Sequence, residues 1–167
     1  MDTFELNWWY VLLPIVLLYA IGIWLGNKGR IIVYRNYNDI MIVGLLVIIP
    51  AAMISLLTFI GNDEAAFESA QGPLIIVTLG LMLITLLLVV IRTFIDNKNP
   101  IKAILALYVK IPTAIMFFVH LLTIFTGTKR NQRRNSIFWA IIMLPLLYGL
   151  VHDKSKGKLP GHRHIRS

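Results

Sequence analysis

Five long apolar runs occupy most of the chain and limit what it can fold into. They cover residues 8–25, 40–61, 73–91, 111–128 and 137–151. A helix that spans a bilayer needs roughly 20 mostly apolar residues, with about 17–25 tolerated. Only helices and closed barrels satisfy every backbone polar group in lipid, and runs of this length favour helices. The sequence therefore predicts an all-α integral membrane protein of about five hydrophobic helices, forming one transmembrane domain over residues 1–167.

Lysine and arginine are distributed unevenly between these runs. Residues 26–39, 92–110 and 152–167 contain all but four of the sixteen lysines and arginines, whereas residues 62–72 contain none. Short loops rich in these residues stay in the cytoplasm. We therefore expect a multi-pass protein of the bacterial inner (plasma) membrane, with its N-terminus outside and its basic C-terminal tail, residues 152–167, in the cytoplasm.

The other four basic residues lie within 129–134 and break this pattern. If residues 111–128 and 137–151 both cross, the basic stretch faces outside. If both are re-entrant, it joins the tail on one cytoplasmic surface, but re-entrant backbone needs cover from other subunits. We favour crossing, because local thinning of the bilayer accommodates short spans. The candidate lipid- or partner-binding residues are Lys129, Arg130, Arg133, Arg134, Lys154, Lys156, Lys158, Arg163 and Arg166.

The segment before the fourth run has two interpretations. Lys102, Ala106 and Lys110 share one helix face, as in a short helix that lies at the membrane surface. Alternatively, residues 103–128 form one long tilted span in which the ammonium group of Lys110 reaches the interface.

Two further sets of residues are candidates for function. Gly22 and Gly26 have the GxxxG spacing that lets helices approach closely, although a simple helix end also explains Gly26. His120 is the titratable residue well inside an apolar run, and intramembrane ionisable residues often serve function. With Lys110 and Thr123 it is a candidate pore-lining residue, although a neutral histidine bonded to a neighbouring group explains it better.

Composition argues against several classes of function. The chain contains no cysteine, and two tail histidines, His162 and His164, have no further ligands nearby, so we expect no metal or cofactor. The carboxylates lie outside the predicted spans, without a recognisable acid–base pair, so we expect no enzyme activity. In so apolar a chain, a net charge of +8 points to anionic lipid headgroups rather than nucleic acid.

These features predict a small non-enzymatic membrane protein that assembles as a homo-oligomeric bundle. Its basic cytoplasmic surfaces would bind anionic lipid and recruit, or sense through, a soluble cytoplasmic protein. Small membrane proteins of this kind often anchor or sense for a larger system, so we expect a component of a bacterial antiviral-defence or secretion system. The alternative is an oligomeric pore, either an ion channel or a holin-like permeabiliser.

Overall fold

The computed structural model describes residues 8–152, and this part of the chain is helical throughout apart from its turns. Its five helices, in chain order, are α1 (Trp8–Asn27), α2 (Tyr37–Ile60), α3 (Glu64–Asn97), α4 (Pro100–Thr126) and α5 (Arg130–Leu150). Each predicted apolar run corresponds to one helix. The predicted all-α architecture is therefore confirmed for the described residues.

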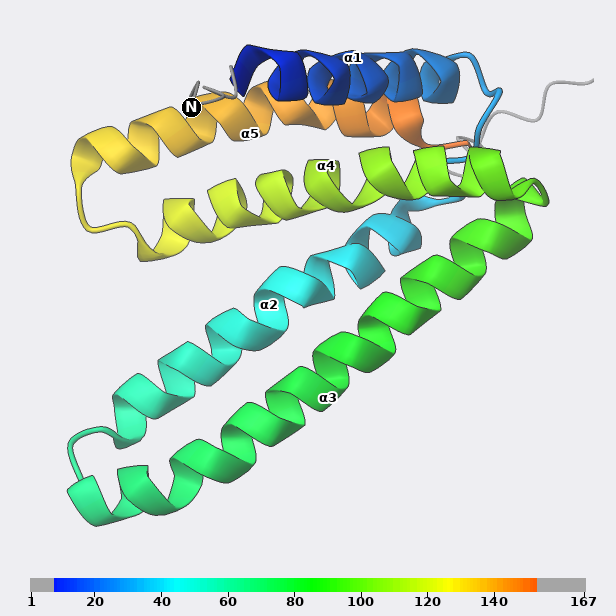
Figure 1. The fold of residues 1–167 in the computed structure, drawn as a ribbon. Coiled ribbons are helices and arrows are strands. Elements are labelled where there is room, and N and C mark those ends of the chain that lie inside the picture. The colour runs from blue at the N-terminus through cyan, green and yellow to red at the C-terminus, as the bar shows by residue number, and fades with distance from the viewer. Residues whose placement is uncertain (1–7, 153–167) are drawn as a thin grey trace, which may run out of the picture.

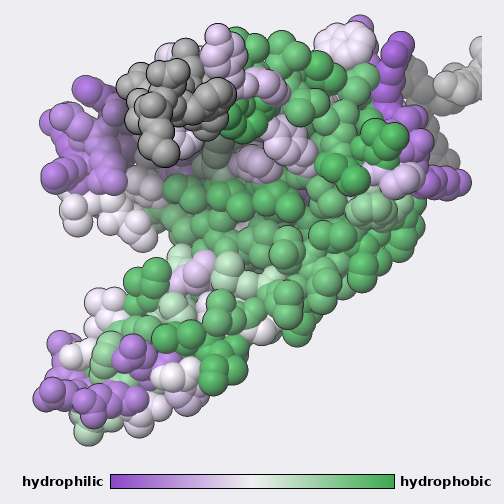
Figure 2. All heavy atoms as spheres, viewed as in Figure 1, coloured by the Kyte–Doolittle hydropathy of each residue, from purple (hydrophilic) through white to green (hydrophobic). Residues whose placement is uncertain are grey.

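The helices differ in how well they suit a membrane. Among the described residues, α1, α2, α3 and α4 are long and apolar enough to cross one. Helix α5 falls short of this measure, because its first turns contain Arg130, Arg133 and Arg134. Figure 2 shows a hydrophobic band across the molecule, with hydrophilic residues gathered towards its ends. These features fit a multi-pass membrane protein.

Polar caps define where the helices begin. The side chains of Asn36, Asp63 and Asn99 accept hydrogen bonds from backbone N–H groups in the first turns of α2, α3 and α4. Lys98 has a left-handed backbone (φ 56°), which ends α3 one residue before the cap of α4. Because its turn is short, the α2–α3 pair is antiparallel, whereas α3 and α4 meet at their turn and diverge from it (Figure 1).

Helix α4 continues without a break through Pro112. Its 27 residues span about 40 Å at 1.5 Å per residue. The separate short surface helix considered for this segment is therefore absent, and the single long helix is the interpretation that the structure supports. The predicted position of the Lys110 ammonium at the interface is wrong, because this side chain is buried.

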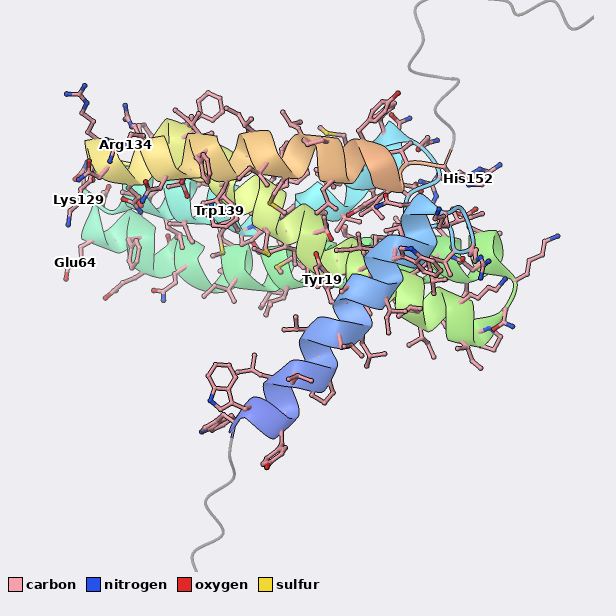
Figure 3. All side chains as sticks on the ribbon, turned by 90° about the horizontal axis from the view of Figure 1, so that it is seen from above. Tyr19, Glu64, Lys129, Arg134, Trp139 and His152 are labelled. Atoms are coloured by element: carbon pink, nitrogen blue, oxygen red, sulfur yellow. The ribbon has the colours of Figure 1, made fainter. Side chains whose placement is uncertain are left out.

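Two helical hairpins, α2–α3 and α4–α5, determine the shape of the molecule (Figure 1). They lie together at one end and diverge towards the other, while α1 crosses α4 and α5 obliquely and contacts them mainly through its C-terminal half (Figure 3). We call these the joined end and the open end. The joined end contains the residues between α1 and α2, the turn between α3 and α4, and the end of α5.

Backbone and side-chain hydrogen bonds hold the joined end together. The N–H of Tyr34 donates to the Leu150 carbonyl (3.4 Å) and the N–H of His152 donates to the Tyr34 carbonyl (2.8 Å). The Asn97 side chain accepts from the N–H of Ile32 (2.9 Å) and donates to its carbonyl (3.0 Å). The segment between α1 and α2 is thus fixed to the end of α5 and to the end of α3.

Glycines permit the closest contacts between helices. A Cβ atom added to Gly22 would overlap the side chain of Val109, and one added to Gly44 would overlap the ring of Phe118. A Cβ on Gly26 would lie 2.7 Å from the side chain of Leu150. Both members of the GxxxG pair therefore lie in contacts within this chain, where α1 approaches α4 and the end of α5.

Candidate functional site

A buried ion pair lies where α2, α3 and α4 meet near the joined end. Lys110 Nζ is 3.8 Å from Asp39 Oδ2, and the two side chains are 2% and 6% exposed. Removing a charged group from water is costly unless opposite charge and hydrogen bonds compensate for the loss. The contacts around both groups therefore decide what this pair can do.

Neighbouring groups surround the Asp39 carboxylate in the first turn of α2. Its Oδ2 accepts a hydrogen bond from the N–H of Arg35 (2.9 Å), and its Oδ1 lies 3.3 Å from Arg92 Nη1. The N–H of Asp39 itself donates to the side chain of the cap residue Asn36 (3.2 Å). The turn that starts α2 thus also orients its buried carboxylate.

The Lys110 side chain has partners from two other elements. Its Nζ donates to Thr93 Oγ1 (3.1 Å), and this hydroxyl in turn donates to the Val89 carbonyl (2.7 Å). The ring of Tyr34 lies 5.8 Å from Nζ, within the range of a cation–π contact. The Lys110 ammonium therefore connects α4 with α2, with α3 and with the segment before α2.

Tyr34 adds a hydrogen bond to the backbone of α4. Its hydroxyl donates to the Lys110 carbonyl (2.6 Å), two residues before Pro112. Burial, the main cause, raises the pKa of this phenol above its ordinary value. The hydroxyl therefore stays protonated, and remains a donor, over the physiological pH range.

Among the candidate pore-lining residues, the structure separates Lys110 from His120 and Thr123, which lie one turn apart on α4. Lys110 faces Asp39, whereas the His120 ring stacks on Trp139 of α5, with centroids 6.3 Å apart and planes at 12°. Ten residues of helix separate the two, which is about 15 Å. The Thr123 hydroxyl donates to the Val119 carbonyl within α4 (2.8 Å). Lys110 thus belongs to the joined end, and His120 to the contact between α4 and α5.

The basic residues of the α4–α5 turn lie at the open end. In Figure 3, Lys129 and Arg134 lie at the same end as Glu64, and His152 lies at the opposite end. Arg133 Nε donates to the Gly127 carbonyl and so closes the turn. A surface hollow of about 590 Å³ is lined by all three arginines of the turn, Arg130, Arg133 and Arg134, together with Asn131 and Ile137.

An apolar groove opens between α2 and α4, beside this basic turn. It has a volume of about 930 Å³. Figure 2 shows the molecule hollowed at this end, between its two lobes. The groove runs along the second half of α2 to Asn62 and along α4 to Thr126, three residues before Lys129. Its lining residues are Ile48, Ala51, Ala52, Ile54, Ser55, Thr58, Phe59, Asn62, Leu122 and Thr126.

The buried cluster was not predicted from the sequence. Asp39 was expected in a loop, yet it lies inside α2, and an acid–base pair that the sequence does not reveal forms with Lys110. One signal points to the pair: a lysine within an apolar helix that does not reach the interface needs a carboxylate, and Asp39 stands directly before an apolar run.

The remaining predicted site residues lie in the tail, outside the described residues: Lys154, Lys156, Lys158, Arg163 and Arg166. Within residues 8–152, no group of three or more His, Cys, Asp or Glu side chains could hold a metal ion. In the comparisons with known proteins, the chain matches no protein-family model, no curated protein and no solved structure.

Proposed function

We propose that this chain is a non-enzymatic multi-pass protein of the bacterial inner membrane that binds anionic phospholipid at its open end. In this proposal the protein works as a homo-oligomer, and its basic tail recruits a soluble cytoplasmic partner. The acyl chains of the lipid lie in the groove between α2 and α4. The phosphate of the lipid contacts the basic α4–α5 turn.

The position of the groove beside the basic turn carries this proposal. Its volume of about 930 Å³ falls within the roughly 300–1,000 Å³ of small-molecule sites. Its lining is mainly apolar, and Lys129 and Arg130 follow Thr126, a lining residue, within four positions. An apolar cleft that ends at cations has the chemistry of an anionic lipid: hydrocarbon tails joined to a phosphate.

The helix lengths support five crossings. Helix α5 has 21 residues and spans about 31 Å. Its apolar part, residues 137–151, spans about 22 Å, so in this proposal the bilayer thins locally and the arginines of the first turns extend to the interface. With alternating crossings, the α4–α5 turn lies on the same side of the membrane as the α2–α3 turn. The residues between α1 and α2 then lie on the other side, which is the cytoplasm under the positive-inside rule.

Cysteine labelling tests this topology. The chain has no cysteine, so Gln132→Cys, Asn62→Cys and Gly29→Cys each introduce a single thiol. We expect an impermeant maleimide to label positions 132 and 62 in intact cells, and position 29 only after lysis. Labelling of position 132 only after lysis, with position 62 labelled in intact cells, would mean that α4 and α5 do not both cross.

Lipid titration tests the open-end site. Native mass spectrometry of the delipidated full chain should show binding of phosphatidylglycerol, and Arg130→Gln/Arg134→Gln should weaken it roughly 10–30-fold. This estimate takes about 1 kcal/mol for each basic residue near a phosphate. Arg133 is left unchanged, because it closes the turn. Ala51→Trp, which fills the groove, should weaken binding without any change of charge.

The matched control is Lys98→Gln/Lys102→Gln, which removes two exposed cations at the joined end. It should bind phosphatidylglycerol at the open end as the unmodified chain does. Equal losses in both double variants would point to non-specific attraction and against this site. Ion conductance in liposomes that contain only this protein would favour the pore alternative instead.

A further inference from the structure

A second, polar pocket lies at the joined end, away from the apolar groove. It has a volume of about 310 Å³ and is lined by Arg35, Asn36, Asp39, Arg92, Ile95 and Asp96. These residues come from the start of α2, the segment before it and the last turns of α3. The lining includes two guanidinium groups and two carboxylates, so the pocket presents both signs of charge.

Both arginines retain hydrogen-bond donors for a ligand. Arg35 Nη1 lies 3.4 Å from Asp96 Oδ1, and Arg92 Nη1 lies 3.3 Å from Asp39 Oδ1. Each contact uses one nitrogen at a long distance, whereas a guanidinium group has five N–H donors. The arginine side chains are 67% and 52% exposed, so the remaining donors are accessible. Two such groups at one pocket suit a phosphate, which arginine binds in a bidentate manner.

The carboxylates of Asp39 and Asp96 differ in their remaining capacity to accept hydrogen bonds from a ligand. Asp39 is held by Arg92, by Lys110 and by the N–H of Arg35. Asp96 pairs with Arg35 through Oδ1, and among the described residues no other hydrogen bond or ion pair is found for it; its side chain is 10% exposed and lines the pocket. Asp96 is therefore the acceptor that remains for a cationic group beside the phosphate.

The position of the pocket relates it to lipid headgroups. Arg35 immediately precedes the cap of α2, and Asp96 is the next-to-last residue of α3. Both helices are long and apolar enough to cross a membrane. The ends of such helices lie at the level of the phosphates, where arginine side chains extend towards the interface.

We infer that this pocket binds the headgroup of a zwitterionic phospholipid with a primary ammonium, phosphatidylethanolamine. The phosphate accepts hydrogen bonds from Arg35 and Arg92, and the ammonium donates to Asp96. The site differs from the open-end site in place, residues and ligand, because the α4–α5 turn that would contact the phosphate there contains cations and no carboxylate. Loss of the phosphatidylethanolamine preference would therefore contradict this inference alone, whereas loss of phosphatidylglycerol binding at the open end would contradict the proposed function alone.

Competition between headgroups tests the inference. The delipidated full chain is titrated, by native mass spectrometry, with phosphatidylethanolamine, phosphatidylcholine and phosphatidylglycerol that carry identical acyl chains. We expect phosphatidylethanolamine to bind at least fivefold more tightly than phosphatidylcholine, whose trimethylammonium cannot donate a hydrogen bond to Asp96. Free phosphoethanolamine should compete weakly, because it lacks the acyl chains. Equal binding of the two zwitterionic lipids, or binding of free phosphoethanolamine as tight as that of the lipid, would overturn the inference.

Two variants connect this preference with the pocket. Arg35→Gln/Asp96→Asn removes an ion pair without changing net charge and should abolish the preference for phosphatidylethanolamine. Asp96→Asn alone leaves both guanidinium groups and should increase phosphatidylglycerol binding severalfold, a gain that unfolding cannot produce. The matched control is Lys102→Gln/Glu68→Gln, an equally neutral change at exposed residues outside the pocket. A preference that survives in the first variant, or no gain in the second, would contradict the assignment.

Discussion

Asp39→Asn is expected to lower the free energy of unfolding by about 3–5 kcal/mol, because it leaves the Lys110 ammonium buried without its carboxylate. The ammonium side chain is 2% exposed, so water cannot replace the lost partner. The same change removes the partner of Arg92. Thermal unfolding of the purified protein in mild detergent, followed by tryptophan fluorescence, measures the loss.

Two further variants make this prediction specific. Asp39→Asn/Lys110→Met removes both charges and should regain much of the lost stability, since an apolar side chain can replace a buried lysine. Asp63→Asn is the matched control: Asp63 caps α3 at an exposed position, and asparagine caps as well as aspartate. An unfolding temperature for Asp39→Asn equal to that of Asp63→Asn would show that the buried pair contributes little.

Gly44→Leu is expected to separate α2 from α4 and to destabilise the protein by about 1–3 kcal/mol or more. Any Cβ at this position would overlap the ring of Phe118, which is 4% exposed. The change can be measured by thermal unfolding and by cross-linking between cysteines introduced on the two helices. If the helices separate, both the unfolding temperature and the cross-linking yield should fall.

The structure offers both a control and a rescue for this variant. Gly80 on α3 has no neighbouring atom within 4 Å of an added Cβ, so Gly80→Leu should be tolerated. Gly44→Leu/Phe118→Ala provides space for the leucine and should recover part of the loss. If Gly80→Leu destabilised the protein as much as Gly44→Leu, helix-wide effects rather than this contact would be responsible.

Apolar run length predicted the number of helices well, because a run of about 20 apolar residues has few alternatives to a helix. It predicted the ends less well. Helix α3 begins at Glu64, before its apolar run, because Asp63 caps it and residues 64–72 are helical without being strongly apolar. Hydrophobicity indicates which residues are buried in lipid or protein, whereas capping residues and turns determine where a helix begins and ends.

The buried cluster shows what a linear pattern cannot reveal. Asp39 and Lys110 lie far apart in sequence and meet only because two hairpins converge at the joined end. A lysine in an apolar helix has two solutions, extension to the interface or a buried partner, and sequence alone does not choose between them. Here Thr93 and Tyr34 complete a buried environment for the ammonium, so the second solution is adopted.

The pairing of Tyr34 with Leu150 and His152 has a consequence for biosynthesis. The segment between α1 and α2 emerges early from the ribosome, yet its partners Leu150 and His152 lie at the end of α5 and just after it, so they emerge late. The α2–α3 hairpin, by contrast, consists of neighbours in sequence and can form as soon as it is synthesised. Maturation of the joined end is therefore a late step, because it requires the synthesis of α5.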